Sequence, residues 1–327
     1  MKLALTGAAG HLGAAILQEL NKRNIPVKAL IRDNDTRACT DLCVEIIKGD
    51  MLQSEVLNKL MQDCDTVIHC AALISVNGDP KGLVHKTNVE GTQLVIDNAL
   101  KAGIKRFIHI SSIHAYQQQP SLKILDEQRE PVNEKGFAYD RSKQAGKQIA
   151  LAANNLGMEV IVIHPTSIIG PHDFKPSLMG NVLIDMYKGR LPFIFNGGFD
   201  FCDCRDVANA IINATTMGEP GQAYLLSGKW YSLKQLAQFL STASAKKINP
   251  VALSLSAAKL GLPVVKLIAA IKKKEPLYTV EALDALFTGN RLISSEKART
   301  GLNYTTRPLE ETVYDTFHWF KNNGYLD

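Results

Sequence analysis

Residues 6–13 read Thr6-Gly7-Ala8-Ala9-Gly10-His11-Leu12-Gly13 and directly follow the apolar run Lys2–Thr6. Three glycines at this spacing, between a strand and a helix, are typical of a loop that binds the pyrophosphate of a dinucleotide. Gly7 allows a tight turn, Gly10 lets the backbone approach the phosphates, and Gly13 lets the helix pack closely on the strand. The helix that opens at His11 and Leu12 adds free N–H groups and the positive end of its dipole. We therefore expect all five residues to contact a cofactor.

Outward from this loop, short apolar runs alternate with segments of helical length. The predicted strands are Lys2–Thr6, Val27–Ile31, Val44–Lys48, Thr66–His69, Arg106–Ser111 and Glu159–His164, and the predicted helices include His11–Arg23, Ser54–Gln62, Lys86–Ala102 and Tyr139–Leu156. Several of these strands are almost entirely apolar, as strands buried on both faces should be. The pattern predicts an α/β fold with a doubly wound parallel sheet of the Rossmann type.

The alternation ends after Pro165, where glycine and proline cluster and helical stretches come to dominate. We expect a dinucleotide-binding domain over residues 1–170 and a smaller substrate-binding domain over most of residues 171–327. The basic amphipathic stretch Leu253–Lys274 is interpreted as a helical wall of the second domain; the alternative is a helix lying on a membrane surface.

Composition excludes several classes of protein. Of 327 residues, 46% are hydrophobic and 21% charged, as in a soluble globular protein, and the net charge of +5 is too small for a nucleic-acid binder. The cysteines lack the spacing of a zinc site, so we expect reduced thiols and no metal; they are Cys39, Cys43, Cys64, Cys70, Cys202 and Cys204. With neither a signal peptide nor a membrane-spanning stretch in the sequence, we expect a cytoplasmic protein with no membrane partner.

The residues after the second strand bear on the choice of cofactor. Ile31 is followed by Arg32 and then by Asp33. A guanidinium at this point favours the 2′-phosphate of NADP, by its charge and its bidentate geometry. An acidic side chain there would instead hold the 2′-hydroxyl of NAD, so Asp33 keeps NAD open as the alternative.

Asp50 and Met51 follow the third strand, where a carboxylate can accept a hydrogen bond from the adenine amino group. We predict that both contact the cofactor. The alternative is that Asp50 caps the helix that begins near Ser54.

Tyr139 and Lys143 are the candidate residues for chemistry. They lie one helical turn apart on the same face of the predicted helix. An ammonium close to a phenol favours the phenolate and lowers the phenol's pKa toward neutral pH. Ser112 follows the strand Arg106–Ser111 at the sheet edge that faces ligands, where it can hydrogen-bond a substrate carbonyl. The alternatives are a surface helix pair for Tyr139 and Lys143 and a strand-end cap for Ser112.

Taken together, these motifs resemble the extended branch of the short-chain dehydrogenase/reductase superfamily, of the NAD-dependent epimerase/dehydratase type. The resemblance rests on residues 6–13, Gly49-Asp50, His69-Cys70-Ala71-Ala72, Asn88-Val89-Glu90-Gly91-Thr92, Ser111-Ser112, Tyr139 with Lys143, His164-Pro165 through Gly170-Pro171, and Arg205-Asp206-Val207-Ala208. Arg32, Arg291-Leu292-Ile293-Ser294 and Leu309–Phe320 look most like dihydroflavonol reductase and 3β-hydroxysteroid dehydrogenase relatives.

The resemblance implies roles for individual residues. Tyr139 would donate or accept the proton, Lys143 would lower its pKa and bind the nicotinamide ribose, and Ser112 would orient the substrate carbonyl. Other residues would contact the cofactor, namely Ala71, Ala72, Asn88 and Pro165. A segment near residues 200–228 would return to the sheet.

The resulting hypothesis is an NADP-dependent enzyme that transfers a hydride between nicotinamide and a ketone, an aldehyde or a secondary alcohol. Its expected partner is a small-molecule substrate, and a homodimer is left open. One alternative is a sugar-nucleotide epimerase or dehydratase with NAD, although Ile113 and His114 stand where dehydratases carry an acidic pair. Another is a module that senses NADP(H) without turnover. His114 is interpreted as a packed or solvated histidine rather than a second acid.

Overall fold

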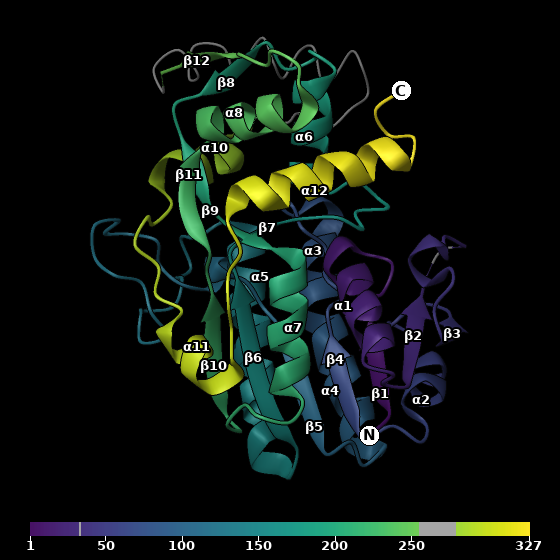
Figure 1. Cartoon of the computed structure of the whole chain (residues 1–327). Coiled ribbons are helices and arrows are strands. Elements are labelled where there is room, and N and C mark those ends of the chain that lie inside the picture. The colour runs from purple at the N-terminus through teal and green to yellow at the C-terminus, as the bar shows by residue number, and fades with distance from the viewer. Residues whose placement is uncertain (33, 255–278) are drawn as a thin grey trace.

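A seven-stranded parallel sheet forms the centre of the molecule (Figure 1). The computed structural model describes residues 1–32, 34–254 and 279–327. The strands are β1 (Leu3–Thr6), β2 (Val27–Ile31), β3 (Val44–Lys48), β4 (Thr66–His69), β5 (Arg106–Ile110), β6 (Glu159–Pro165) and β10 (Gln222–Leu226). Their order is β10-β6-β5-β4-β1-β2-β3, and every neighbouring pair is parallel. The predicted doubly wound α/β fold is confirmed, because the order reverses direction at β1.

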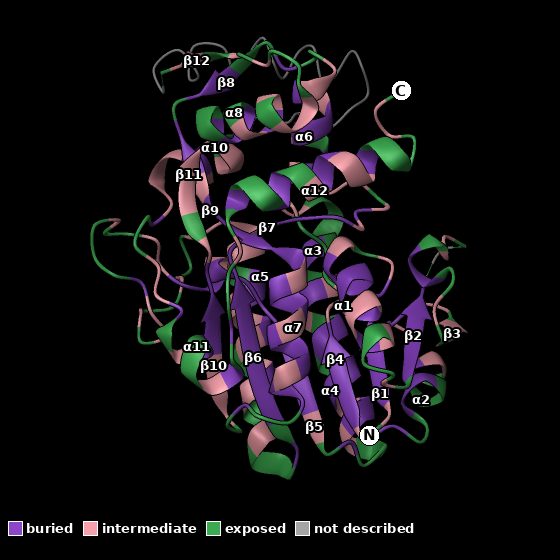
Figure 2. Cartoon of the chain, in the orientation of Figure 1, coloured by how far each residue is buried: buried purple, intermediate pink, exposed green. Residues whose placement is uncertain are grey.

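The strands are apolar because both faces of the sheet are covered. In Figure 2 the central strands are buried along their length, and β1, β2 and β4 contain only buried residues. At the edge, β3 has three exposed positions out of five. Such near-continuous burial is expected of a parallel sheet between two helical layers.

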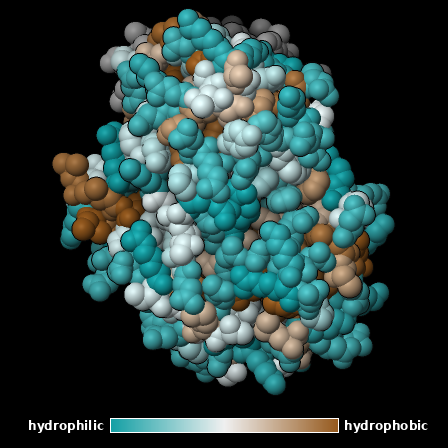
Figure 3. Space-filling model, in the orientation of Figure 1, coloured by the Kyte–Doolittle hydropathy of each residue, from teal (hydrophilic) through white to brown (hydrophobic). Residues whose placement is uncertain are grey.

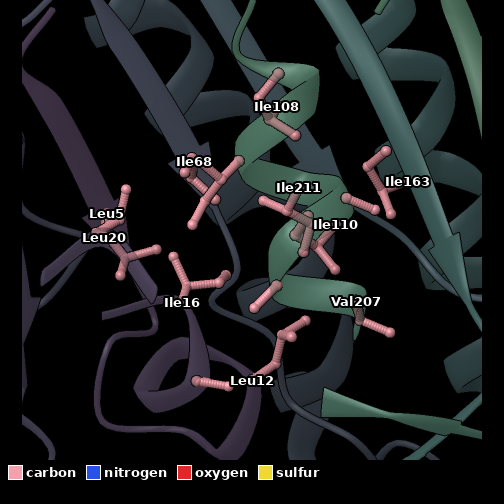
Figure 4. Close-up of a cluster of buried hydrophobic side chains, with 14 of the residues drawn as sticks. Leu5, Leu12, Ile16, Leu20, Ile68, Ile108, Ile110, Ile163, Val207 and Ile211 are labelled. Atoms are coloured by element: carbon pink, nitrogen blue, oxygen red, sulfur yellow. The ribbon is translucent and has the colours of Figure 1, made fainter. Parts of the chain in front are cut away.

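Helices cover the two faces in separate sets. α1 (His11–Lys22) and α7 (Cys204–Ala214) lie together on one face, where their aliphatic side chains meet isoleucines of the sheet (Figure 4). α2 (Ser54–Met61), α4 (Gly91–Lys101) and α5 (Ala138–Ala153) bury a second cluster on the other face.

The chain leaves the sheet after β6 to begin an upper lobe over its carboxyl edge, returns with β10 beside β6, and then completes the lobe (Figure 1). The lobe contains a three-stranded sheet, β11-β9-β7, and a two-stranded sheet, β12-β8. Its elements are β7 (Ser167–Ile169), α6 (Leu178–Tyr187), β8 (Phe193–Phe195), β9 (Gly198–Asp203), β11 (Lys229–Ser232), α8 (Leu233–Ser244), β12 (Val251–Leu253), α10 (Val280–Thr288) and α12 (Leu309–Asn322), while α11 (Glu296–Leu302) packs on α7 and β10. Apart from its first two residues, the predicted helix Leu253–Lys274 lies outside the described residues.

Two predicted helices are each divided in the structure. The segment Lys86–Ala102 begins with a π-helical turn, Lys86–Glu90, before α4, and α5 ends in a 3₁₀ turn, Asn154–Leu156. The other short helical turns are Arg37–Cys39, Pro80–Gly82, Leu83–His85 (α3) and Ile113–Ala115.

The surface in Figure 3 is largely hydrophilic, with an apolar patch at the left over the loop that precedes α5. Within the described ranges, no helix is both long and apolar enough to cross a membrane. All six cysteines are free thiols.

Candidate active site

The glycine loop connects β1 to α1, and its three glycines have different neighbours. Gly7 has a φ of +74°, and a Cβ there would lie 2.6 Å from the backbone nitrogen of Ala71. A Cβ at Gly13 would lie 2.1 Å from the carbonyl oxygen of Gly7. At Gly10 the nearest atom is the same oxygen, at 3.3 Å. The fold therefore requires glycine at 7 and 13, whereas at Gly10 it leaves space beside the start of α1.

His11 and Leu12 use their side chains for the fold. The His11 Nε2 lies 3.1 Å from each of the carbonyl oxygens of Gly170 and Pro171, which joins α1 to the loop after β7. Leu12 is buried in the cluster between α1, α7 and the sheet (Figure 4). Both residues precede the first helical hydrogen bond, from Ala14 N–H to Gly10 C=O at 2.8 Å. Only their backbone N–H groups can therefore serve an anion.

The segment after β4 is held in place by Asn88. The Asn88 side-chain oxygen accepts the N–H of Leu73 at 2.7 Å, and its nitrogen donates to the Leu73 carbonyl at 2.9 Å and to the Ser142 hydroxyl at 3.0 Å. Ala71 N–H donates to the Thr6 hydroxyl at 3.3 Å. These hydrogen bonds fix the position of the segment that follows β4, the strand beside β1. The predicted cofactor residues Ala71 and Ala72 belong to this segment. Asn88, predicted to touch the cofactor, engages protein groups with its whole amide.

The three predicted catalytic residues come together where β5 ends and α5 begins. Tyr139 lies in the first turn of α5, close enough to Ser112 for that side chain to act on the pKa of the phenol. Lys143, one turn later, is buried and donates from Nζ to the carbonyl oxygen of Ile110 at 2.8 Å. The Ser111 hydroxyl donates to the Lys143 carbonyl at 3.1 Å, so α5 is tied twice to the end of β5.

Burial controls the ionisation of this group. It raises the pKa of Tyr139 to about 12; the hydrogen bond from Ser112 acts in the lowering direction, and the charge of Asp140 adds to the rise. Burial lowers the pKa of Lys143 to about 8. The direction of the Tyr139 pKa differs from the sequence-based expectation because burial has the largest effect on it, and the Lys143 ammonium is directed to the Ile110 carbonyl. At neutral pH the phenol is therefore protonated and can act as an acid.

His114 is the neighbour of Tyr139 that the sequence analysis interpreted as packed or solvated. It occupies the turn after Ser112, and its N–H donates to the Ser112 hydroxyl at 3.2 Å. Its ring Nδ1 lies 3.1 Å from Oδ1 of Asp140. The ring meets the Tyr139 ring edge-on, with the centroids 6.0 Å apart. The imidazole is thus paired with a carboxylate beside the predicted catalytic phenol.

The residues predicted to hold the adenosine half follow β2 and β3. Arg32 comes directly after β2 and is exposed; Asp33, on which the NAD alternative depends, lies outside the described residues. One oxygen of Asp50 accepts the N–H of Leu52 at 2.9 Å. Asp50 therefore stabilises the turn before α2, whose N-cap is Gln53 and not Asp50, and Met51 is buried.

Beneath these residues, three buried histidines lie on the strands of the sheet. His69 on β4 stacks on His109 of β5, with centroids 5.6 Å apart, and His164 on β6 places Nδ1 2.9 Å from the Ser112 carbonyl oxygen. Burial lowers the pKa of His69 and of His164 to about 3, and that of His109 well below its usual value. Pro165, the last residue of β6, is buried beside them. Sequence reasoning missed this row, since a histidine within an apolar strand gives no signal of its depth.

The arrangement fits a dinucleotide. The space at Gly10 lies beside N–H groups of α1, a cradle that a Cβ would narrow, and a buried ammonium and two hydroxyls stand farther along the same sheet edge. The first is suited to a pyrophosphate and the second to the reacting end of a nicotinamide.

Comparisons with known proteins agree with this geometry. Sterol demethylase protein B of Methylococcus capsulatus is 28% identical over 331 residues, covering 100% of both chains. A protein of Synechocystis sp. whose name likens it to dihydroflavonol 4-reductase is 27% identical, covering 98% of this chain and 95% of its own. The crystal structure of gox2253 superposes with a TM-score of 0.85 at 28% identity, covering 100% of this chain and 99% of that one.

A family profile settles the wider relationship. The profile described as "NAD dependent epimerase/dehydratase family" matches residues 3–227, which include the whole seven-stranded sheet. Members of this family are NAD(P)-dependent enzymes, and the predicted membership of the extended short-chain dehydrogenase/reductase superfamily is confirmed. The chain belongs to the NAD-dependent epimerase/dehydratase family.

Proposed function

We propose that this protein is an NADP-dependent oxidoreductase that transfers a hydride between the nicotinamide and a ketone, an aldehyde or a secondary alcohol. The observation that carries the proposal is the convergence of Ser112, Tyr139 and Lys143 at one sheet edge, with the phenol protonated. The nicotinamide, when bound, supplies or accepts the hydride. Tyr139 then acts as general acid or base at the substrate oxygen, and Ser112 orients that oxygen by a hydrogen bond.

The cofactor would lie along the sheet edge from β2 to β6. The N–H of Gly10 already donates to the Gly7 carbonyl at 3.0 Å, so the N–H groups of His11 and Leu12 would hold the pyrophosphate, and Arg32 the 2′-phosphate. Lys143 would bind the nicotinamide ribose. The remaining predicted contacts are Gly7, Gly13, Asp50, Met51, Ala71, Ala72, Asn88 and Pro165, of which Asn88 would act by holding the segment that begins at Leu73.

We assign cofactor binding to residues 1–170 with a returning segment near 200–228, and substrate binding to most of residues 171–327. Two carboxylates lie near Tyr139, since Asp140 adjoins it and the charge of Asp140 acts on Glu281. These carboxylates disfavour a diphosphate substrate. The exposed side chains of Leu73 and Ile74, just beyond Ala72, offer apolar surface instead. A neutral, apolar ketone suits this apolar surface, in keeping with the sterol in the name of one relative.

The first test is to find the substrate and then to remove the phenol. Purified protein is screened with NADPH against steroid-like ketones, other ketones, aldehydes and nucleotide sugars. With the substrate found, Tyr139→Phe should lower kcat by about 10²- to 10⁴-fold, about 3 to 5 kcal/mol of barrier, because general acid catalysis is lost. NADPH affinity should change little, since the hydroxyl acts on substrate, whereas Lys143→Ala should weaken NADPH as well.

The outcome that would sink the proposal is a Tyr139→Phe variant that keeps more than about a tenth of wild-type kcat. Co-purified NAD together with turnover of a nucleotide sugar would identify an epimerase or dehydratase. NADPH binding without turnover of any carbonyl compound would identify a sensing module.

A further inference from the structure

His114 carries a carboxylate partner of its own beside the phenol of Tyr139. The Nδ1–Oδ1 distance to Asp140 is 3.1 Å, and the two side chains are 32% and 17% exposed. Because Nδ1 faces Asp140, the second nitrogen, Nε2, is the one that can exchange protons. Within residues 1–32, 34–254 and 279–327, no protein group hydrogen-bonds that Nε2. A carboxylate that orients an imidazole so that its other nitrogen stays open is the arrangement of a proton-transfer pair.

We propose that His114, oriented by Asp140, is the positioning residue that passes protons between solvent and Tyr139. The inference rests on the proposed function, in which Tyr139 loses or gains a proton in every turnover.

The proton balance of turnover calls for such a residue. In reduction, the Tyr139 O–H bond breaks and the proton goes to the substrate oxygen, which leaves a phenolate. The phenolate takes a proton from Nε2 of the His114 imidazolium, directly or through one water molecule, since the ring centroids are 6.0 Å apart. Neutral His114 then takes a proton from water. Oxidation runs the same transfers in reverse.

Other groups near Tyr139 are less suited to this task. Lys143 is buried and directs its ammonium to the Ile110 carbonyl. Ser112 cannot supply a proton on its own, because a neutral hydroxyl that gives up its proton must receive another one at the same time. Among the described neighbours, His114 combines partial exposure with an imidazole, which can both accept and release a proton.

Within the described part of the chain, the charged and titratable groups that face the pair come from two elements. Tyr139 and Asp140 lie on α5, and Glu281 lies at the start of α10, where burial and the charge of Asp140 raise its pKa. Glu281 is itself held by the N–H of Gly78 at 2.9 Å. A change in the pH dependence must therefore be assigned by variants of His114 and Asp140 separately.

A first experiment needs neither substrate nor cofactor. Protein labelled with ¹³C at Cζ of tyrosine is titrated by NMR between about pH 5 and 8, the range in which histidines change charge. The Tyr139 signal is assigned by its loss in Tyr139→Phe. We expect its shift to follow a histidine titration that disappears in His114→Gln and moves in Asp140→Asn. A Tyr139 signal unchanged by His114→Gln would overturn the proposal.

The control is a second histidine–carboxylate pair away from the site. The His85 Nδ1 lies 3.3 Å from Oε1 of Glu90, and both side chains are largely exposed. His85→Gln should leave the Tyr139 titration and all kinetics as in the wild type.

A second experiment follows turnover once a substrate is known. His114→Gln should lower kcat roughly tenfold or more, with KM little changed and the kcat–pH profile flattened between about pH 5 and 8. Added imidazole should restore part of the rate of His114→Ala. A rate and pH profile equal to those of His85→Gln would refute the relay. If Tyr139→Phe also kept its activity, the proposed function itself would fail, whereas an inactive Tyr139→Phe would confine the failure to His114.

Discussion

Arg32 and Arg37 lie on the same connection after β2, and either guanidinium could be considered for the 2′-phosphate. Arg37 donates to both oxygens of Asp35, the shorter bond at 2.6 Å, and to the Tyr325 hydroxyl at 2.9 Å. Arg32 comes directly after β2, where a bound nucleotide would place its ribose. Position therefore favours Arg32 for the 2′-phosphate, while Arg37 secures the loop.

We predict that Arg32→Ala abolishes the preference for NADPH over NADH. Loss of a charge-assisted contact to phosphate, worth about 1.5 to 3 kcal/mol, corresponds to an affinity decrease of roughly 10- to 150-fold for NADPH alone. Titration of nicotinamide fluorescence measures both constants. Arg37→Ala is the matched control for removing positive charge from the same loop and should keep the preference. Equal binding of NADPH and NADH by the wild type would contradict the assignment.

Among individual residues, those whose positions relative to one another are fixed by local spacing could be predicted from the sequence. Tyr139 and Lys143 are one helical turn apart, and Ser112 comes just after a strand, so these three positions follow from the helix and strand periods. The Asn88 clamp on Leu73 and Ser142 and the pairing of His114 with Asp140 join residues that are distant in sequence. No pattern in one sequence specifies such contacts, because they depend on how α5 lies against β5.

In the connection between β1 and α1, one glycine is needed for packing and another is proposed to lie beside the cofactor. Gly13 packs against the carbonyl of Gly7, whereas Gly10 has room on its ligand side. A side chain at Gly13 must displace backbone, and a side chain at Gly10 fills the space where phosphates would lie.

We predict that Gly10→Val leaves a folded protein that no longer binds NADPH, and that Gly13→Val prevents stable folding. Circular dichroism and thermal unfolding report on the fold, and fluorescence titration reports on NADPH. The reason is that a Cβ meets its nearest atom at 3.3 Å in the first case and at 2.1 Å in the second. Normal NADPH binding by a folded Gly10→Val protein would show that the phosphates lie elsewhere.

The elements of the first half could be predicted because each is specified by its own residues. The strands β2, β3 and β4 have the predicted bounds, since short apolar runs between helices admit few other structures. The upper lobe could not be assigned in this way. Its strands β7, β8 and β12 have three residues each, too few for a period, and they exist only through pairing with β9 and with each other.

For the whole molecule, the buried histidines set a limit on stability in acid. His69 and His164 have pKa values of about 3, and that of His109 is also well below its usual value. The unfolded chain takes up a proton on each of these histidines near pH 6.5, whereas the folded protein does not. Stability therefore falls as the pH drops from about 6.5 toward 3. The buried Asp200, whose pKa is raised to about 6, acts in the opposite direction and offsets part of this loss.

We predict a loss of about 2 kcal/mol of unfolding free energy for each buried histidine between pH 7.5 and pH 5. Urea unfolding at the two pH values measures the sum. His109→Phe, which keeps a ring on His69, should reduce the loss by about one histidine's share, whereas the exposed His85→Gln should not. Unfolding free energies that are equal at both pH values would contradict the argument.

The return of the chain to the sheet has a consequence for biosynthesis. β6 leads out of the sheet at Pro165, and its outer partner β10 is not made until residue 226. A nascent or truncated chain that stops before residue 222 therefore presents β6 as an open strand edge, six of whose seven residues are buried in the complete protein. An apolar edge of this kind pairs readily with another chain. Synthesis of β10 therefore covers the edge of β6 and lowers the risk of aggregation. Release of the chain before that point leaves this apolar edge open.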